Sequence, residues 1–387
     1  MRFRRCSPSP RRRSRRAVAI LFTVCVIVAA VTGCADFSRQ DSEREAGPFS
    51  ENTETFRIPS TTPPPESPES TEPEEPPTGP CIDPDPAVIA TCLASTGGLR
   101  PGDDLGEITV VAERSTGKIV TTKRYGPQKT VATFDVDASG DGGLIDFAFS
   151  PTYAQDQLIY ALITTPSDNR VVRLAPGDVA KPILTGIPKG PTGNMGALRF
   201  VSENELLVAT GNAGNAGAAS DPGSLAGKLL SVTSLTSGTS ARPKVLVSGL
   251  GSNVALCTSG DGATVYLTDQ TPTEDRLQAV ADDGPTVLWT WPDRPQVAGC
   301  AVTQGQVFVT TTRTKHIEAL QQPTSDQPTA TAPTVVLKDR FGALGRISAL
   351  DNGVMQVATV NKQSGQAAPT DDRVFRFMAT PAADGRD

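Results

Sequence analysis

Residues 144–186 read LIDFAFSPTYAQDQLIYALITTPSDNRVVRLAPGDVAKPILTG and hold four short apolar runs separated by polar turns. The runs are LIDFAFS (144–150), LIYALIT (158–164), RVVRLA (170–175) and PILTG (182–186). Each has the length of a β-strand, and the turns between them are rich in Pro, Gly, Asp and Asn. No helical period persists across the stretch. It therefore predicts an antiparallel meander of four strands.

The same unit recurs from about residue 94 to residue 378, in six copies. Runs that correspond to 158–164 are ITVVA (108–112), LLVAT (206–210), TVYLT (264–268), QVFVT (306–310) and VMQVAT (354–359). The runs that follow them are KIVTTKR (118–124), KLLSVT (228–233), RLQAVA (276–281), KHIEAL (315–320) and RVFRFM (373–378). Small-residue runs precede five of the six units, as in GALRFVS (196–202), NVALCTS (253–259), VAGCAVT (297–303) and GRISALD (345–351). Fourth runs close several units, as in KVLVS (244–248) and TVLWTW (286–291).

Repeats of three or four strands at intervals of roughly 40–60 residues are typical of a β-propeller. One such unit cannot bury both of its faces, but six units in a ring bury them against each other. An array of β-sandwiches is the competing interpretation, although sandwich repeats run nearer 100 residues. We therefore expect an all-β, six-bladed propeller over residues 81–380, with inner strands around a central channel. Little chain is left after Met378, so residues 87–93 are expected to complete the last blade, and residues 381–387 to form a disordered tail.

The first 33 residues have the layout of an export signal. Residues 2–16 hold eight Arg and no acidic residue, and residues 17–31 form an apolar run that is short for a transmembrane helix. Val31-Thr32-Gly33-Cys34 then follows the pattern of a bacterial lipobox, whose Cys sulfur receives diacylglycerol. We expect residues 1–33 to be a cleaved lipoprotein signal peptide. Cys34 would then carry the lipid, with palmitate among its acyl chains, on the extracytoplasmic face of the cell membrane.

Two features of this signal leave alternatives open. An uncleaved signal anchor with a chance Cys is the competing interpretation of the apolar run. Ser14-Arg15-Arg16 also permits export by the twin-arginine route as well as by the general secretory route.

Cleavage would make the chain strongly acidic. The eight arginines leave and no acid does, so 28 basic residues stand against 42 acidic ones, for a net charge of −14. Such a charge argues against a nucleic-acid partner, which needs a basic surface, and against a polybasic membrane contact. We expect a monomer that contacts the membrane through its N-terminal lipid and has an unknown envelope ligand or protein as its partner.

Residues 34–80 predict a tether between the lipid and the propeller. Eight of the twenty residues in 61–80 are Pro and five are Glu. A segment of this composition cannot bury enough apolar surface to fold, and it favours an extended chain. A docking motif for a proline-recognising partner is the alternative to a plain spacer.

Four cysteines remain in the expected propeller: Cys81, Cys92, Cys257 and Cys300. In an exported protein they predict two disulfides, for which three connectivities exist. Cys81 and Cys92 are close in sequence, so they are expected to close a small loop. Cys257 and Cys300 hold matching places in the inner runs of consecutive units, so their bond would join two neighbouring blades. A structural metal site is disfavoured, because the chain has no CxxC pair and a single His.

Two segments carry a resemblance to a known family. One runs from Gly142 through LIDFAFSP to LIYALIT (158–164), and the other from GALRF (196–200) through ATGNAG (209–214) to SLAGKLL (224–230). Both resemble blade signatures of the soluble quinoprotein glucose and sorbosone dehydrogenases, and the resemblance extends over about 141–378. It implies six blades, a channel that binds pyrroloquinoline quinone (PQQ), and oxidation of sugars or aldehydes.

The resemblance also implies site residues, and this chain lacks the main ones. The family's general base is a His before the third inner strand, and that place falls at about Gly193. The segment that corresponds to the family's cofactor-binding Arg-Asn pair is residues 249–253 (GLGSN), which has neither an Arg nor a clear Arg-Asn pair. Gly193 cannot accept a proton, and the quinone carboxylates would lose their main partner. His316 is expected in a third strand near the outside of its blade, on the surface. No catalytic residue is therefore predicted.

A second resemblance covers the whole chain. The lipobox, the Pro-rich tether and the segments TPSDNRVVRL (165–174), TGIPKG (185–190) and VLWTWPDRP (287–295) are similar to those of the LppZ-type lipoproteins of mycobacteria and other actinobacteria. This resemblance implies an actinobacterial envelope protein.

Two further groups of residues are candidates for binding. Asp135, Asp137, Asp141 and Asp146 loosely follow the spacing of a calcium loop, with a polar turn between blades as the alternative, so no metal site is predicted. Lys189, Asn194, Asn253 and Arg346 begin or precede inner strands and are the candidates for polar groups at the channel mouth.

Together these features predict a cell-envelope lipoprotein whose propeller binds a ligand or a protein without catalysis and without a cofactor. The alternative is a PQQ-dependent sugar or aldehyde dehydrogenase with a divergent site, which would use PQQ and Ca²⁺. A purely structural envelope protein is a third class.

Overall fold

The computed structural model describes residues 77–238, 242–260, 262, 264–281, 284–324, 331–365 and 367–379. The predicted signal peptide (1–33), Cys34, the tether up to residue 76 and the tail at 381–387 lie outside the described residues. Within the described ranges, no helix is long and apolar enough to cross a membrane.

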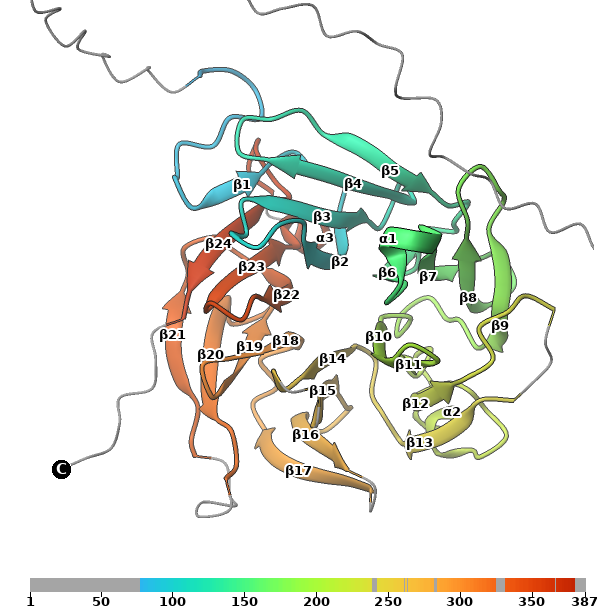
Figure 1. Ribbon diagram of the computed structural model, residues 1–387. Helices are drawn as coiled ribbons and strands as arrows, with labels where there is room; N and C mark the ends of the chain where they lie inside the picture. Colours follow the sequence, from blue (N-terminus) through green and yellow to red (C-terminus); the bar gives the residue numbers. More distant parts are fainter. Residues whose placement is uncertain are drawn as a thin grey trace, which may run out of the picture. The chain divides into compact units, whose positions relative to one another are not determined.

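The described chain forms a six-bladed β-propeller, as predicted (Figure 1). Each blade is a four-stranded antiparallel sheet. The first blade is β2 (Thr96–Pro101), β3 (Ile108–Glu113), β4 (Lys118–Lys123) and β5 (Lys129–Thr133). The second is β6 (Leu144–Phe149), β7 (Ile159–Thr164), β8 (Asn169–Leu174) and β9 (Lys181–Ile187). The third is β10 (Ala197–Ser202), β11 (Glu205–Ala209), β12 (Lys228–Val232) and β13 (Lys244–Ser248).

The second half of the ring repeats this order. The fourth blade is β14 (Val254–Thr258), β15 (Val265–Gln270), β16 (Asp275–Ala281) and β17 (Gly284–Trp291). The fifth is β18 (Val297–Thr303), β19 (Gln306–Thr311), β20 (His316–Gln321) and β21 (Thr334–Lys338). The sixth is β22 (Leu344–Ala349), β23 (Val354–Thr359), β24 (Val374–Met378) and β1 (Val88–Ala90). In every blade the first strand of the repeat lies nearest the centre of the ring (Figure 1).

The sixth blade joins the two ends of the described chain. Its outer strand is β1, which pairs antiparallel with β24 through Val88 opposite Phe375 and Ala90 opposite Val374. The expectation that residues 87–93 complete the last blade is therefore confirmed. The ring closes through hydrogen bonds between the first and the last strand of the described chain.

Apolar side chains fill the space between neighbouring sheets. Between the second and third blades, for example, Ile145 and Leu162 pack in one buried cluster with Leu198 and Val208. Each fully buried Leu or Ile side chain contributes about 1.5–3 kcal/mol relative to an exposed one. Alternate residues of each strand face the two neighbouring blades, which is why the central strands of a blade are apolar on both faces.

Both predicted disulfides are present. Cys257 in β14 is bonded to Cys300 in β18, so the bond joins the inner strands of the fourth and fifth blades. Cys81 is bonded to Cys92 across a separation of 11 residues, and this small loop contains β1.

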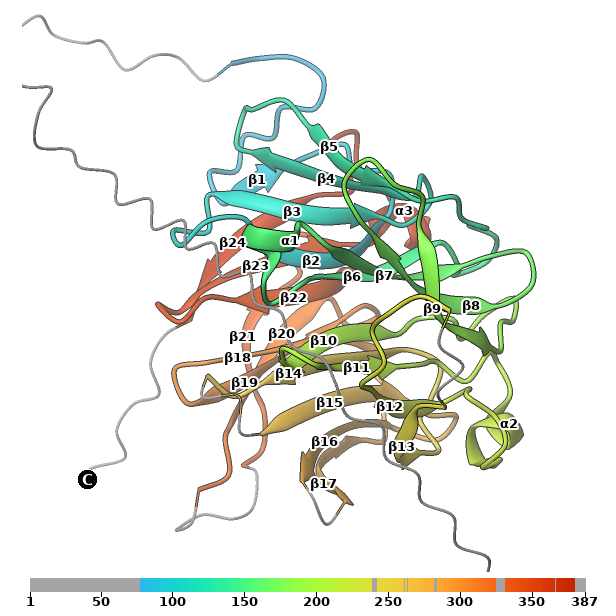
Figure 2. The same cartoon turned by 45° about the vertical axis from the view of Figure 1, so that its right-hand side comes forward.

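Three short helices lie in the described connections between strands: α1 (Tyr153–Asp156), α2 (Ala216–Ser220) and α3 (Asn361–Ser364). Figure 2 shows the propeller turned by 45°, and both views place α2 beside β12 and β13. The side chain of Asn215 caps α2 by accepting a hydrogen bond from the Ala218 N–H. These helices shape the loops at the ends of the blades and leave the inner strands to line the channel.

Candidate functional site

The channel mouth holds a cavity of about 340 Å³, which we call the mouth cavity. It lies where the inner strands begin, since Gly193, Asn253 and Gln296 each precede or adjoin the first residue of such a strand. Hydroxyl and amide side chains make up most of its lining: Thr96, Thr192, Ser252, Asn253, Gln270, Gln296, Thr312, Gln363 and Ser364. Among the described lining residues, the charged ones are Asp141 and Arg346.

Gly193 is the position at which the resemblance predicts the family's general base, and its surroundings leave no room for a side chain. Its φ of +80° is in the left-handed region that favours glycine. A Cβ built on Gly193 would lie 2.4 Å from the Gly214 nitrogen and 2.7 Å from Asn212 Oδ1. The Ala213 N–H also donates to the Gly193 carbonyl over 2.8 Å. The turn at 211–215 therefore fills the space that an imidazole would need.

The carboxylate at the mouth is held by donors of the chain itself. Asp141 accepts hydrogen bonds from the Gly193 N–H at 2.7 Å and from the Asn194 side-chain amide at 2.5 Å. The Asn194 N–H adds a third bond at 3.2 Å. These contacts fix the loop before β10 and occupy both carboxylate oxygens.

The four candidate mouth residues separate into two pairs. Asn253 and Arg346 line the mouth cavity, and Asn253 Oδ1 is buried there with no partner among the described residues. Lys189 instead pairs with Asp137, with 2.5 Å between Nζ and Oδ2. Asn194 is buried beneath the mouth, where its amide oxygen accepts from Asn169 Nδ2 at 3.0 Å. Lys189 and Asn194 therefore support the loops of the mouth rather than face its cavity.

The four candidate calcium ligands do not come together. The hydrogen bond from Lys189 holds the pKa of Asp137 well below its usual range. Asp141 is bound at the mouth, and Asp146 lies in β6 beside Arg100, while Asp135 is exposed. In the described part of the chain, no group of three or more His, Cys, Asp or Glu residues is placed to hold a metal ion.

His316 starts β20, the third strand of its blade, as predicted. Its side chain is 13% exposed, so the expectation of a surface His is wrong. Nε2 lies 2.7 Å from Glu318 Oε1, and Glu318 also accepts from Trp291 Nε1 at 2.7 Å. The imidazole therefore belongs to a polar cluster between the fourth and fifth blades and does not line the mouth cavity.

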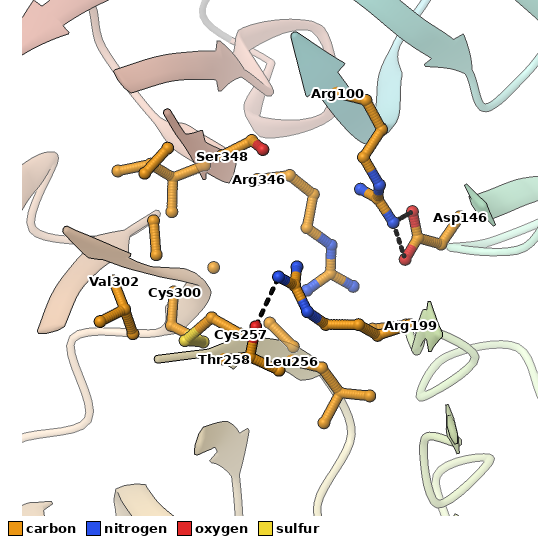
Figure 3. A pocket seen from close by; sticks show the side chains of 16 residues that line it. Arg100, Asp146, Arg199, Leu256, Cys257, Thr258, Cys300, Val302, Arg346 and Ser348 are labelled. Carbon is orange, nitrogen blue, oxygen red and sulfur yellow. Dashed lines mark hydrogen bonds and ion pairs between the residues drawn. A yellow bond between two sulfur atoms is a disulfide. The ribbon is translucent and has the colours of Figure 1, made fainter. Parts of the chain in front are cut away.

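A second cavity of about 60 Å³ lies deeper in the channel, and we call it the arginine cavity (Figure 3). Arg100, Asp146, Arg199 and Arg346 contribute its charged groups, from inner strands of the first, second, third and sixth blades. Arg100 lies 3.2 Å from Asp146. Residues late in the inner strands, such as Thr258, Val302 and Ala349, line the far side of this cavity.

Arg346 lines both cavities and spans the channel between them. Its Nη1 donates to the Ala298 carbonyl in the fifth blade, and its Nη2 donates to the Gly196 carbonyl before the third, both over 2.7 Å. Burial lowers the pKa of Arg346 to about 10, so the group stays charged at neutral pH. The Arg346 guanidinium thus connects the sixth blade to the third and fifth blades through hydrogen bonds.

Arg100 and Arg199 are absent from the residues singled out in the sequence. A signal for them exists, because Leu99-Arg100 and Leu198-Arg199 both stand in Gly-rich first strands of the repeat, as does Gly345-Arg346. A charged residue inside such an inner strand is a candidate for the channel, since the space between neighbouring blades is filled by apolar side chains.

The mouth does not fit PQQ well. The quinone's carboxylates need cationic partners. Among the described lining residues, the single cation is Arg346, and two of its nitrogens are already bonded to carbonyls. Asp141 would instead repel a carboxylate. The residues present therefore do not form a site for this cofactor.

Comparisons with known proteins agree with the fold. Residues 98–260 match the family model described as glucose/sorbosone dehydrogenase. No curated protein sequence matches the chain. The PQQ-bound aldose sugar dehydrogenase from Streptomyces coelicolor is 26% identical with a TM-score of 0.66, over 75% of this chain and 95% of that one. A putative glucose dehydrogenase from Thermus thermophilus is 24% identical with a TM-score of 0.65, over 75% and 98%. The soluble aldose sugar dehydrogenase from Escherichia coli is 16% identical with a TM-score of 0.60, over 76% and 99%.

Residues 98–260 thus match the glucose/sorbosone dehydrogenase family model, and the six-bladed propeller that contains them is similar in structure to sugar dehydrogenases, one of them solved with PQQ bound.

Proposed function

We propose that this protein is a lipid-anchored, extracytoplasmic propeller of the cell envelope that binds a ligand or a protein at its channel mouth and does not oxidise sugars. The observation that carries the proposal is the closed packing at Gly193, where a Cβ would lie 2.4 Å from the Gly214 nitrogen. A general base must reach the proton that it removes. At this place the chain has neither the base nor the space for one.

No neighbouring side chain of the described mouth supplies the missing base. Asn212 and Asn253 carry amides, which do not accept protons at neutral pH. Asp141 lines the mouth, but its oxygens accept hydrogen bonds from Gly193 and Asn194. Both carboxylate oxygens of Asp141 are therefore already engaged by donors of the chain itself.

The chemistry of the mouth is that of a recognition site. Its hydroxyl and amide groups can donate and accept hydrogen bonds without a net charge. Asn253 Oδ1 is a buried acceptor without a partner in the described chain, so a ligand donor at that atom would offset its desolvation. These groups suit a neutral, hydroxyl-rich ligand or the backbone of a peptide.

The envelope location rests on the sequence before the propeller. The Arg-rich start, the short apolar run and the Val31–Cys34 lipobox are typical of a bacterial lipoprotein. Two disulfides in the propeller are consistent with an oxidising, extracytoplasmic compartment. The similarity to LppZ-type lipoproteins supports the same location in an actinobacterial envelope.

A PQQ-dependent sugar dehydrogenase with a divergent site is the second candidate. It is favoured by the 26% identity with the PQQ-bound enzyme from Streptomyces coelicolor and by the domain match at 98–260. In that case residues other than those of the family would bind the quinone and remove the proton.

A titration of the purified protein with PQQ in the presence of Ca²⁺ distinguishes the two. Binding is followed by calorimetry, and reduction of an electron-accepting dye is then measured with a panel of aldoses. The Streptomyces coelicolor enzyme serves as the positive control in the same assays. We expect neither saturable PQQ binding nor dye reduction. Tight binding with turnover would overturn the proposal in favour of the dehydrogenase.

A further inference from the structure

The arginine cavity concentrates positive charge inside an acidic protein. Its described lining holds three guanidinium groups, from Arg100, Arg199 and Arg346, and one carboxylate, from Asp146. The whole chain has a net charge of −6. An excess of two positive charges in one small cavity is unfavourable unless something of opposite charge shares it, because the charges repel at short range and are partly removed from water.

Two of the three arginines are accounted for by the fold. Arg346 bonds to the carbonyls of Ala298 and Gly196. Arg100 bonds to Asp146, and its Nη2 also donates to the Phe147 carbonyl at 2.7 Å. The inner edge of each innermost strand has no neighbouring strand, so its carbonyls need such donors. Arg100 and Arg346 therefore have structural roles.

Arg199 differs from the other two. In the described part of the chain, its hydrogen bond is made by Nη2 with the Thr258 hydroxyl at 2.6 Å. Figure 3 shows its guanidinium between Arg346 and the inner strand of the fourth blade, directed into the cavity. Burial and the nearby Arg100 together lower the pKa of Arg199 to about 10. Most of its five N–H groups are left to face the cavity.

Asp146 acts on Arg199 through charge at longer range, while its hydrogen bonds are made with other groups. Its carboxylate accepts from Arg100, from the Phe147 N–H at 2.8 Å and from the Leu198 N–H at 2.8 Å. These bonds hold the carboxylate among the inner strands of the first, second and third blades, beside Arg100. The remaining positive charge lies on Arg199 and Arg346.

The size of the cavity limits what can bind there. It measures about 60 Å³. One water needs about 10–15 Å³ by this measure, so the cavity has room for a group of a few heavy atoms. A carboxylate or phosphate group is small enough for this cavity and carries the opposite charge. Its oxygens also match the planar arrangement of the guanidinium N–H groups.

We propose that the arginine cavity is an oxyanion-binding site in which Arg199 is the principal ligand-binding residue, assisted by Arg346 and by the Thr258 hydroxyl. The oxyanion is a carboxylate or phosphate group, either a free ion or the acidic end of a larger ligand. It enters from the end of the channel opposite the mouth, where Thr258, Val302 and Ala349 lie at or next to the last residue of their strands. The site does not depend on the function proposed for the mouth, and it would remain if the mouth bound PQQ.

The test is a calorimetric titration of the full chain, purified in detergent at low salt, with inorganic phosphate, glucose 6-phosphate, gluconate and glucose. The variant Arg199→Gln removes the proposed ligand-binding group. Arg340→Gln is the matched control, since Arg340 is an exposed arginine paired with Asp85 on the surface. Thermal unfolding shows whether Arg199→Gln is folded. If it is not, Arg199→Lys, which keeps the positive charge, tests the same site.

We expect the wild-type chain to bind at least one of the three anions, and Arg199→Gln to bind it roughly tenfold to hundredfold more weakly, as for the loss of one charge-assisted pair. Arg199→Lys is expected to lie between the two, because an ammonium cannot reproduce the guanidinium fork. Arg340→Gln should bind like the wild type. A sugar phosphate or sugar acid that binds more tightly than phosphate would identify the larger ligand as the source, and equal binding would identify the free ion.

Two results would overturn the proposal. One is the absence of binding of all three anions at millimolar concentration. The other is equal anion binding by Arg199→Gln and Arg340→Gln in folded protein. Neutral glucose tests the mouth separately, because its binding should not change with Arg199.

Discussion

At the scale of the residue, the contacts between Gly193 and the turn at 211–215 limit which side chains can fit at the channel mouth. The Gly193 N–H donates to Asp141, and its carbonyl accepts from Ala213, so both polar groups of this residue are used. Its Cα faces the Gly214 nitrogen and the Asn212 side chain. The backbone itself therefore leaves no space for a side chain at Gly193, the position where the sequence resemblance predicts a base.

Gly193→Ala is predicted to destabilise the protein more than glycine's conformational freedom alone explains. A left-handed φ costs an alanine about 1–2 kcal/mol. The collision with Gly214 and Asn212 should add about 1–3 kcal/mol, as overpacking does elsewhere. The free energy of unfolding in urea measures the sum.

Gly177→Ala is the matched control for Gly193→Ala. Gly177 has a φ of +70°, and a Cβ there meets nothing within 4 Å. It should show the cost of the backbone conformation alone. Equal losses in the two variants would mean that the turn at 211–215 gives way easily, and that the mouth could then admit a side chain.

The sequence predicted the mouth only in part, for physical reasons that differ between residues. Asn253 directly precedes an inner strand, so its position along the chain predicted its place at the mouth. Lys189 and Asn194 stand in a longer loop, where direction depends on partners such as Asp137 that are distant in sequence. Arg199 was missed because a single arginine in a strand resembles a solvent-facing residue until the ring is assembled.

At the scale of the elements, the three-residue strand β1 completes the sixth blade. It covers the outer edge of β24 and carries Val88 into a buried cluster that includes Phe341 and Phe375. Without it, the sixth blade would have three strands and an open edge, and the chain ends would not be joined.

Val88→Asp is therefore predicted to cost about 3 kcal/mol or more, because it buries a carboxylate in an apolar cluster. Val335→Asp is the control, since Val335 lies in β21, the outer strand of the fifth blade, and is 52% exposed. We expect Val335→Asp to change stability by less than about 0.5 kcal/mol. Thermal unfolding with light scattering checks both, and a small effect of Val88→Asp would show that β1 is dispensable for ring closure.

The strands that the sequence predicted are those with strong apolar patterns. The second and third strands of all six units were found, since they are buried on both faces. β2 was missed, because Thr96–Pro101 reads TGGLRP and has one large apolar residue. β5 and β21 are largely exposed outer strands with a weak pattern. The number of large apolar residues in a strand, rather than its burial, therefore explains the outcome, since β2 is mostly buried and was missed, whereas the largely exposed β13 was found.

At the scale of the whole molecule, the repeat determined the architecture, whereas the proposed location in the cell rests on the sequence of residues outside the propeller. The propeller forms because six units pack face to face. Its fold therefore gives no evidence about the lipobox at Val31–Cys34, and the proposed lipidation of Cys34 needs its own experiment.

Cys34→Ser is predicted to move the protein from the membrane fraction to the soluble fraction of the cells that make it. The acyl chains on Cys34 would supply the membrane affinity, at about 0.8 kcal/mol per buried methylene, and serine cannot carry them through a thioether. Fractionation and the mass of the N-terminal peptide provide the measurement. Cys25→Ser, in the apolar run, should leave the location unchanged. Membrane retention of Cys34→Ser would favour an uncleaved signal anchor.

The Cys81–Cys92 disulfide has a mechanical consequence. The bond connects the chain before β1 directly to the chain after it, so residues 82–91 form a covalently closed loop. Tension applied at the N-terminal side of Cys81 would pass through the two sulfurs to Cys92 and on into β2. The strand that closes the ring would carry almost none of that load. If the chain is pulled from its N-terminal side, the pairing of β1 with β24 would in this way stay out of the line of force.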